Sequence, residues 1–332
     1  MQKGEKLKDP IVVTGAAGMV GSHLIDELLK LNQKVIGIDD LSVGKLENVS
    51  HHFQNSNFTF LKIDILDLEN LFMNVRAAAT IVHLAASKKI GEEGSGFRTL
   101  TVNAKGTENI LKLARALKSQ VIFGSTSDVY GMSNAIPFRE DGDLVLGPSL
   151  IKRWSYAVAK LYGEQMAFAF HKEFGIPVVV LRYFGAFSER SSFTWSGGHV
   201  PIFIDTILKD EEVVIHGDGS QTRCMGHVSD LVSGTVATLE NFDQVSGEVM
   251  NIGNDEELSV VDTAKLIHKI ANTGKPLKLK FVPFKEIFGE YKDVQRRLPD
   301  LTKARKLLGY KPLVSLEKAI QMTIAERRKV SV

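Results

Sequence analysis

Cysteine is almost missing from this chain, and several other features are absent as well. Cys224, the single cysteine among 332 residues, leaves no internal disulfide and no cysteine-based metal cage. No segment reaches the ~18 uninterrupted apolar residues of a membrane span, and residues 1–10 lack the apolar core of a signal peptide. Lysine and arginine are scattered and the net charge is only +2, so no nucleic-acid stripe or membrane-surface helix is indicated. We therefore expect a cytoplasmic protein without a metal site, and neither nucleic acid nor a membrane as a partner.

Short β-branched runs alternate with helix-like segments in the first half of the chain. Nearly all-apolar strands separated by helices are typical of a parallel sheet covered on both faces. Because such crossovers are right-handed, the alternation predicts an α/β fold with a Rossmann-type, doubly wound parallel sheet. The predicted strands are residues 11–14, 34–39, 58–64, 80–85, 120–124 and 177–183, and the predicted helices include 20–31, 103–117 and 154–174.

The alternation breaks after the sixth predicted strand. Residues 188–199 are polar and contain glycine, which predicts a loop over a ligand. A helix over 201–208, a strand over 213–216 and mixed short elements then predict a smaller C-terminal α/β lobe. We expect two closely packed units with a cleft between them: residues 1–183, onto which a segment near 227–254 can pack back, and residues 184–332.

A glycine-rich loop follows the first predicted strand. Gly15, Gly18 and Gly21 stand at three-residue intervals where the first helix opens. This arrangement lets backbone N–H groups and the helix N-terminus approach a pyrophosphate. The loop predicts a dinucleotide site, and the alternative is a tight turn without a ligand. The residues expected to contact the dinucleotide here are Gly15, Ala17, Gly18, Met19, Val20 and Gly21.

Two aspartates end the second predicted strand and indicate which dinucleotide is bound. Asp39 lies 24 positions after Gly15, where a carboxylate accepts hydrogen bonds from the adenosine ribose and repels a 2′-phosphate. Asp40 adds negative charge, and residues 41–43 supply no arginine. The pattern predicts NAD rather than NADP.

The ends of the third and fourth predicted strands are expected beside the same ligand. Asp64, followed by Ile65, either reaches the adenine amino group or is a solvated strand-end carboxylate. Small residues after the fourth strand let the chain pass close to the nicotinamide end, and His83 is interpreted as structural. We expect Leu84, Ala85 and Ala86 to contact the cofactor, and Ser87 to contact the substrate.

Tyr156 and Lys160 are four residues apart on a predicted helix and therefore share one face. A phenol has a pKa near ~10, and an adjacent cation stabilises its anion and lowers that pKa. Such a tyrosine can take a proton from a hydroxyl while a cofactor takes the hydride.

The fifth predicted strand leads into a hydroxyl-rich stretch. In an open α/β sheet the carboxyl ends of strands border the active site. Ser125 or Thr126 can therefore bind the oxygen that Tyr156 deprotonates, although such hydroxyls also cap turns. Ser127 and Asp128 follow, and Asp128 offers a second acid–base group.

These residues resemble the extended short-chain dehydrogenase/reductase family, in its branch of nucleotide-sugar epimerases, dehydratases and decarboxylases. The resemblance runs along essentially the whole chain. Its motifs are the loop at 14–21, His-Leu-Ala-Ala at 83–86, Ser-Thr-Ser-Asp-Val-Tyr-Gly at 125–131, Tyr156/Lys160, Leu-Arg-Tyr-Phe at 181–184, Gly-Asp-Gly-Ser-Gln-Thr-Arg at 217–223 and the segment 296–310.

The resemblance implies a role for each matching residue. Tyr156 is the catalytic base, Lys160 lowers its pKa and holds the nicotinamide ribose, and Thr126 completes the triad. Arg223 pairs with the substrate diphosphate or is a solvated strand arginine. Arg297 contacts substrate or forms a surface ion pair. The implied partner of the C-terminal lobe is a UDP-, GDP- or dTDP-linked sugar, and NAD binds the first domain.

The resemblance also implies a shared first step, oxidation of the sugar at C4, after which three reactions diverge. Asp128 favours the 4,6-dehydratase or UDP-glucuronate decarboxylase type over the 4-epimerase, because dehydratases and decarboxylases of the family usually carry glutamate there. Residues 153–156 also resemble the decarboxylases. A 4-epimerase is the alternative, and a non-catalytic NAD-binding regulator or a simple alcohol dehydrogenase is more remote.

Two departures from the family pattern concern the substrate pocket. Gly185 stands where the family usually has a substrate-contacting asparagine, and Ser-Glu-Arg at 188–190 replaces Gly-Pro-Arg. Trp195 either stacks on a sugar or base or holds the loop in place. The helices at 103–117 and 154–174 resemble those of a four-helix dimer interface, so we expect a homodimer.

Overall fold

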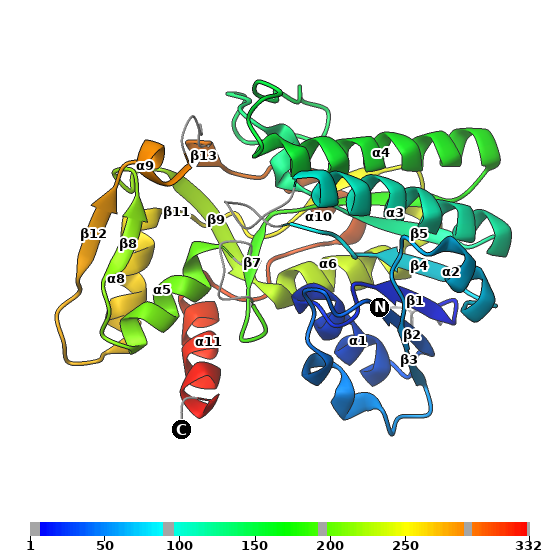
Figure 1. Cartoon of the computed structure of the whole chain (residues 1–332), viewed down its shortest axis with the longest axis horizontal. Coiled ribbons are helices and arrows are strands. Elements are labelled where there is room, and N and C mark those ends of the chain that lie inside the picture. Colours follow the sequence, from blue (N-terminus) through cyan, green and yellow to red (C-terminus); the bar gives the residue numbers. More distant parts are fainter. Residues whose placement is uncertain (1–6, 89–95, 192–197, 289–293, 331–332) are drawn as a thin grey trace.

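The central feature is a seven-stranded parallel sheet with helices on both faces (Figure 1). The computed structural model describes residues 7–88, 96–191, 198–288 and 294–330. The strand order is β10-β6-β5-β4-β1-β2-β3, and every pairing is parallel. The predicted doubly wound Rossmann-type sheet is therefore confirmed. Its strands are β1 Ile11–Thr14, β2 Val35–Asp39, β3 Phe58–Lys62, β4 Thr80–His83, β5 Gln120–Thr126, β6 Val178–Tyr183 and β10 Val249–Ile252.

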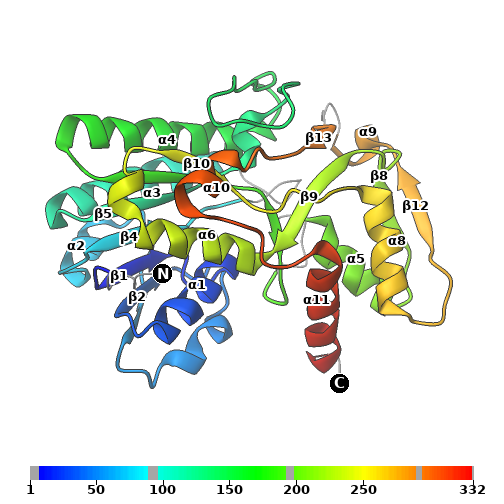
Figure 2. The ribbon, with the colours of Figure 1, turned by 180° about the vertical axis from the view of Figure 1, so that it is seen from behind.

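Alternating strand side chains build one apolar core on each face of this sheet. Val13 packs with Leu24 on the face covered by α1 (Met19–Lys30) and α6 (Val228–Glu240). Val12 packs with Ile110 on the face covered by α3 (Gly96–Leu117) and α4 (Trp154–Phe174). Figure 2 shows α6 and α1 on one side of the strands and α3 and α4 on the other. A short helix, α2 (Leu68–Asn74), contacts α3. The connection from β2 to β3 contains two short 3₁₀ turns, η1 Leu46–Asn48 and η2 Ser50–His52.

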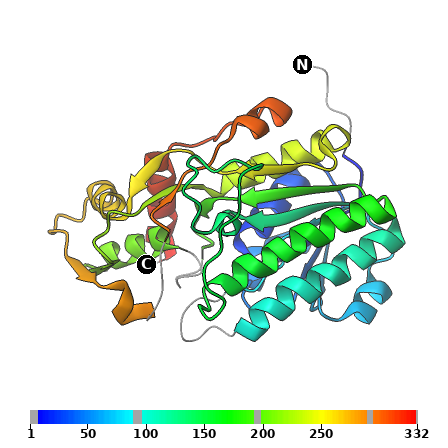
Figure 3. The ribbon, with the colours of Figure 1, turned by 90° about the horizontal axis from the view of Figure 1, so that it is seen from above.

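The segment 227–254 belongs to this layered part, because α6 lies beside α1 and β10 pairs with β6. The remaining C-terminal elements form a smaller mixed unit beside it (Figure 3). In that unit β9 (Thr222–His227) pairs with β7 (Gly185–Phe187), β11 (Glu257–Ser259) and β13 (Arg296–Arg297). A two-stranded sheet joins β8 (Val213–His216) to β12 (Leu279–Val282). The helices of this unit are α5 His199–Leu208, α8 Val260–Ala271, α9 Phe284–Phe288 and α11 Leu316–Val330. Two further short helices, α7 Phe242–Val245 and α10 Thr302–Leu308, pack on α6 in the layered part.

Several predicted boundaries were wrong by a few residues. β5 runs two residues further than predicted, to Thr126, because those residues still pair with Arg182 and Tyr183 of β6. α3 begins at Gly96 rather than at residue 103. Phe97 and Leu100 in its first turns are exposed, so this part of the helix lacks the apolar periodicity by which a buried helix is recognised. No helix in the described ranges is long and apolar enough to cross a membrane.

A buried ion pair ties α4 to the sheet. The guanidinium of Arg182 on β6 donates to both carboxylate oxygens of Glu164 on α4, at 3.0 Å and 2.8 Å. The Ser125 hydroxyl on β5 donates to Glu164 Oε1 at 2.5 Å. Both members of the pair are almost completely buried. The pair therefore fixes α4 against β5 and β6 with its charges compensated.

We predict that Arg182→Met destabilises the protein by about 3–5 kcal/mol, because it leaves the Glu164 carboxylate buried without its partner. Urea unfolding followed by circular dichroism measures the change. The matched control is Arg139→Met, which removes an equally bidentate but exposed pair with Asp141 at 3.0 Å and 3.0 Å. We expect this control to leave the unfolding midpoint nearly unchanged. Equal destabilisation by the two variants would contradict the role assigned to the buried pair.

Candidate functional site

The carboxyl ends of the central strands open onto two adjoining cavities. One lies over the glycine-rich loop and the ends of β2 and β3. The other lies between the sheet and the smaller unit, over the ends of β5 and β6. Met19, Val20, Leu84 and Ala86 line both, so the two cavities form one continuous groove. We call them the dinucleotide cavity and the sugar cavity.

The glycine-rich loop leaves a cradle free of side chains at the N-terminus of α1. Gly15 has φ +71°, and a Cβ on it would lie 2.8 Å from the backbone nitrogen of Ala85. A Cβ on Gly21 would collide with the carbonyl oxygen of Gly15. Gly15, Gly18, Met19, Val20 and Gly21 line the dinucleotide cavity, and Ala17 lies behind them in the core. The cradle fits a pyrophosphate, which needs close approach of backbone N–H groups.

Asp39 holds the loop in position as well as facing the cavity. Its carboxylate accepts hydrogen bonds from the backbone N–H groups of Ala17 at 2.9 Å and Leu41 at 2.8 Å. Burial raises the pKa of Asp39, and these two hydrogen bonds oppose that rise. A half-exposed arginine that the sequence analysis missed, Arg98 on α3, lies 3.5 Å from the carboxylate of Asp40 and lines the same cavity.

The other predicted cofactor contacts also line the dinucleotide cavity, namely Asp64, Ile65, Leu84, Ala85 and Ala86. Ser87, which we expected to contact substrate, lines this cavity too rather than the sugar cavity. The reason is local, because its backbone N–H donates to the side chain of Asn103 and its carbonyl accepts from that side chain, each at 2.9 Å. His83 is structural as expected: it is buried between the hydroxyls of Thr14 and Thr107, at 2.7 Å and 3.1 Å. Burial lowers its pKa to about 3.

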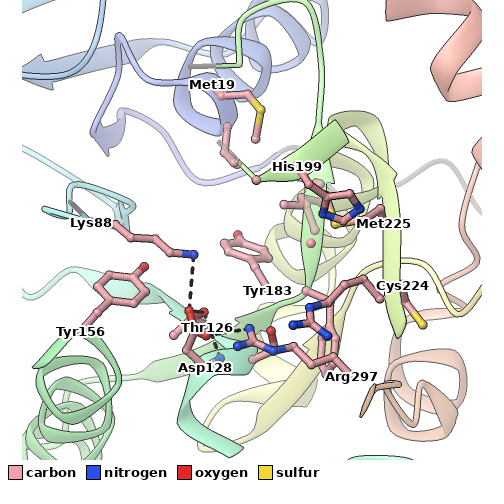
Figure 4. Close-up of a pocket in the computed structure, with 18 of the residues that line it drawn as sticks. Met19, Lys88, Thr126, Asp128, Tyr156, Tyr183, His199, Cys224, Met225 and Arg297 are labelled. Carbon is pink, nitrogen blue, oxygen red and sulfur yellow. Dashed lines mark hydrogen bonds and ion pairs between the residues drawn. The ribbon is translucent and has the colours of Figure 1, made fainter. Parts of the chain in front are cut away.

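Tyr156 and Lys160 both line the sugar cavity from α4, as Figure 4 shows for the tyrosine. Lys160 Nζ donates to the backbone carbonyl of Gly124 at 2.7 Å. Burial lowers the pKa of Lys160 to about 7, against the opposing charge of Glu164. Burial and the charge of Asp128 raise the pKa of Tyr156. This direction is opposite to the lowered pKa that was expected, because burial and a nearby carboxylate both act on the phenol.

The hydroxyl groups after β5 have two different roles, one in holding the fold together and one in lining the cavity. Ser125 donates to Glu164, so its hydroxyl is engaged in the ion pair that holds α4. Thr126 accepts a hydrogen bond from the backbone N–H of Asp128 at 3.2 Å and lines the sugar cavity beside Ser127. Of the two hydroxyls considered for the substrate oxygen, the geometry favours Thr126.

Asp128 is surrounded by three cations. Its Oδ1 lies 2.6 Å from Arg297 Nη1 and 3.6 Å from Arg153 Nη2, and its Oδ2 lies 3.3 Å from Lys88 Nζ (Figure 4). Burial alone would raise the pKa of Asp128, but the charges of Arg297, Lys88 and Arg153 hold it well below its usual value. The carboxylate is therefore firmly ionised and a weak base.

A two-residue strand brings two distant arginines together. In β13, Arg297 is the register partner of Arg223 on β9, and both line the sugar cavity. Arg223 Nη1 donates to the carbonyls of Thr222 and Val294, each at 2.8 Å, which fixes its guanidinium at the cavity wall. Arg297 forms an ion pair inside the cavity rather than on the surface.

Gly185 lines the sugar cavity, and a neighbouring side chain fills the space beside it. A Cβ at this position would collide with the sulfur of Met225, which lines the same cavity from β9. The methionine thus takes up the space that a larger residue 185 would need. Trp195 lies outside the described residues.

Sequence reasoning missed some residues of the sugar cavity. Lys88 lies in the loop after β4, and the rule that strand ends border the site would have included it. Other lining residues come from the smaller unit, where no local pattern distinguishes them from core. They include His199, Phe203, His216, Gln221, Cys224 and Phe284.

Comparisons with known proteins agree with this geometry. The family model of GDP-mannose 4,6 dehydratase matches residues 12–323. A UDP-N-acetyl-alpha-D-glucosaminuronate decarboxylase of Bacillus cytotoxicus is 34% identical over 98% of this chain and 99% of its own. UDP-glucuronic acid decarboxylase 1 of Xenopus tropicalis is 35% identical over 98% of this chain and 73% of its own.

A solved structure is similar over nearly the whole fold. The UDP-glucuronic acid 4-epimerase of Bacillus cereus, in complex with UDP-glucuronic acid and NAD, superposes with a TM-score of 0.85 at 33% identity, covering 96% of this chain and 99% of its own. This chain therefore belongs to the extended short-chain dehydrogenase/reductase family, as an NAD-dependent enzyme of the branch that modifies nucleotide-linked sugars.

Proposed function

We propose that this enzyme decarboxylates a nucleotide-linked hexuronate through a 4-keto intermediate. The observation that supports the hexuronate substrate most strongly is the excess of positive charge in the sugar cavity. Its described lining includes four cationic side chains besides Lys160, and one carboxylate, that of Asp128. A substrate diphosphate neutralises part of this charge, and a C6 carboxylate neutralises more, whereas a neutral hexose leaves it unpaired. The four cations are Lys88, Arg153, Arg223 and Arg297.

Each of the two parts of the chain binds one of the two ligands. In this proposal residues 1–183, together with the segment near 227–254, hold NAD through the glycine cradle and Asp39. The lobe from residue 184 holds the nucleotide sugar, with Arg223 on the diphosphate. The relatives support the uronate class, because the two decarboxylases and the 4-epimerase are all named for a UDP-linked uronic acid.

The first step is oxidation at C4 of the sugar, for which bound NAD supplies the hydride acceptor. Thr126 positions the C4 oxygen and Tyr156 takes its proton as the hydride leaves. The raised pKa of Tyr156 makes an adjacent cation necessary, and Lys160, one helical turn away, is placed to stabilise the phenolate. Because burial lowers the pKa of Lys160 to about 7, this lysine can also transfer a proton near neutral pH.

The second step is loss of carbon dioxide. A C4 ketone makes the C6 carboxylate a β-keto acid, so the C5–C6 bond breaks and its electron pair forms the enolate of the ketone. C5 then takes a proton and the ketone is reduced again. This route requires no base at C5, whereas dehydration does. The strongly lowered pKa of Asp128 makes it a poor C5 base, which favours decarboxylation. Asp128 acts as a positioning residue for Arg153 and Arg297.

Epimerisation at C4 of the same uronate is the second candidate. The solved Bacillus cereus structure favours it, since that enzyme is named as a 4-epimerase. The same cations suit its substrate, so the charge of the cavity does not separate the two reactions.

Product analysis separates the reactions. We predict that UDP-glucuronate, incubated with the NAD-loaded protein, gives a product lighter by one carbon dioxide, detected by mass spectrometry. An unchanged mass with a new retention time would instead identify the epimerase. GDP-, dTDP- and UDP-linked neutral hexoses are the control panel. Loss of water from one of them, with UDP-glucuronate untouched, would overturn the uronate assignment.

Loss of the phenol should stop the chemistry but leave binding intact. We predict that Tyr156→Phe lowers kcat about 100- to 10,000-fold, because proton transfer to a positioned group is lost, while NAD affinity stays within twofold. Steady-state kinetics and NAD titration measure the two effects. Tyr162→Phe, on an exposed ring of the same helix, is the matched control and should retain full activity. Full turnover by Tyr156→Phe would refute the mechanism.

We also propose that the enzyme is a homodimer formed through α3 and α4. These helices lie side by side on the outer layer of the molecule (Figures 1 and 3). Large apolar side chains are exposed along them, and a face of this kind is typical of an interface. They are Phe97 and Leu100 on α3, and Val158, Tyr162 and Phe174 on α4.

We predict that the double substitution Leu100→Glu and Val158→Glu converts the dimer to a monomer, because it buries unpaired charge in the interface. Sedimentation velocity at micromolar concentration measures the mass. Phe281→Glu, at an exposed apolar residue on β12, is the control and should remain dimeric. A wild-type protein that sediments as a monomer would contradict the proposed dimer.

A further inference from the structure

Lys88 reaches into the sugar cavity at the point where two catalytic elements meet. Its Nζ lies 3.3 Å from Asp128 Oδ2 and 5.2 Å from the centroid of the Tyr156 ring. Figure 4 shows the ammonium next to the phenol and above Asp128, with Arg297 on the other side of the aspartate. No motif in the sequence singled out this lysine.

Lys88 is held differently from the two arginines that share Asp128. Arg297 and Arg153 both approach Oδ1, whereas Lys88 approaches Oδ2. The side chain of Lys88 is 35% exposed, against 16% for Arg297 and 5% for Arg153. A flexible four-carbon stem and a wetter position make its ammonium the easiest of the three to redirect.

The position of Lys88 matches the connectivity of the sugar. C6 is attached to C5, the neighbour of C4, so a C6 carboxylate lies close to the oxygen that Tyr156 deprotonates. A cation beside Tyr156 is therefore within reach of that carboxylate. Asp128 is also paired with Arg297 at 2.6 Å and Arg153 at 3.6 Å, so two cations remain beside it when Lys88 moves away.

We propose that Lys88 is the specificity-determining residue for the C6 carboxylate, and that its ammonium moves from Asp128 to the substrate when a uronate binds. This assignment rests on the proposed function, because it requires a uronate substrate. A neutral hexose offers the ammonium no anion and leaves it on Asp128. The discrimination between the two sugar classes then comes from one charge-assisted contact.

The proposed ion pair between Lys88 and the C6 carboxylate contributes to substrate binding and not to cleavage of the C5–C6 bond. It stabilises the carboxylate in the bound substrate, and that charge disappears as carbon dioxide leaves. Removing the lysine therefore raises KM without lowering kcat, which is the pattern of lost ground-state binding. A lysine that only supported the fold or oriented Asp128 would lower kcat or weaken both sugars alike.

The test measures binding of UDP-glucuronate and UDP-glucose by calorimetry, on NAD-loaded protein carrying Tyr156→Phe so that neither ligand is consumed. We expect Lys88→Met to weaken UDP-glucuronate binding at least about tenfold, the scale of a hydrogen bond to a charged group, and to change UDP-glucose binding less than twofold. Lys88→Arg should restore most of the preference. Lys105→Met removes an exposed lysine of α3 that pairs with Glu108, and should change neither affinity.

The outcomes distinguish this assignment from the proposed function. Equal weakening of both sugars, or no change for either, with a parent protein that prefers UDP-glucuronate, overturns the role of Lys88 alone. A parent that shows no such preference overturns the uronate substrate and this assignment with it. In the enzyme with Tyr156 intact, a loss of kcat at unchanged KM in Lys88→Met would also overturn the assignment.

Discussion

The buried pair of Arg182 and Glu164 is the constraint on which the geometry of the site depends. It joins β6 to α4, and the hydroxyl of Ser125 on β5 binds the same carboxylate. Three elements are thereby fixed to one another just below the cavity. Tyr156 and Lys160 extend from the first turns of α4, and Thr126 directly follows Ser125. The distance between the phenol and the threonine hydroxyl is therefore set by an ion pair that itself never meets substrate.

Burial of this kind has an electrostatic consequence for the catalytic groups. Desolvation raises the pKa of Tyr156 and lowers that of Lys160, so each is driven toward its neutral form. Asp128 is buried too, but it stays ionised because the charges of three surrounding cations lower its pKa. The cavity thus keeps one carboxylate ionised while it holds the phenol protonated. The charge of a substrate entering this cavity becomes part of its electrostatic balance.

Local sequence patterns predicted most of the sheet and the dinucleotide cavity. Each of these signals lies within a short stretch of sequence. The glycine spacing predicts the nucleotide loop, Asp39 predicts the ribose contact, and the strand alternation predicts the sheet. That three cations meet at Asp128 could not be found in this way. Lys88, Arg153 and Arg297 are far apart in sequence, and Arg297 enters the cavity on a two-residue strand whose pairing with β9 leaves no periodic signal. The pKa of Tyr156 was misjudged for a related reason, since burial depends on packing that a spacing of four residues does not contain.

The contact between Gly185 and Met225 couples the size of one residue to the conformation of the other. The glycine leaves room for the Met225 sulfur, and a larger residue at 185 requires the methionine side chain to move. Methionine is unbranched and flexible, so it can adopt another rotamer. The asparagine that is usual in the family at position 185 would therefore displace the methionine side chain within the cavity, and the two positions determine together how much space a sugar finds there.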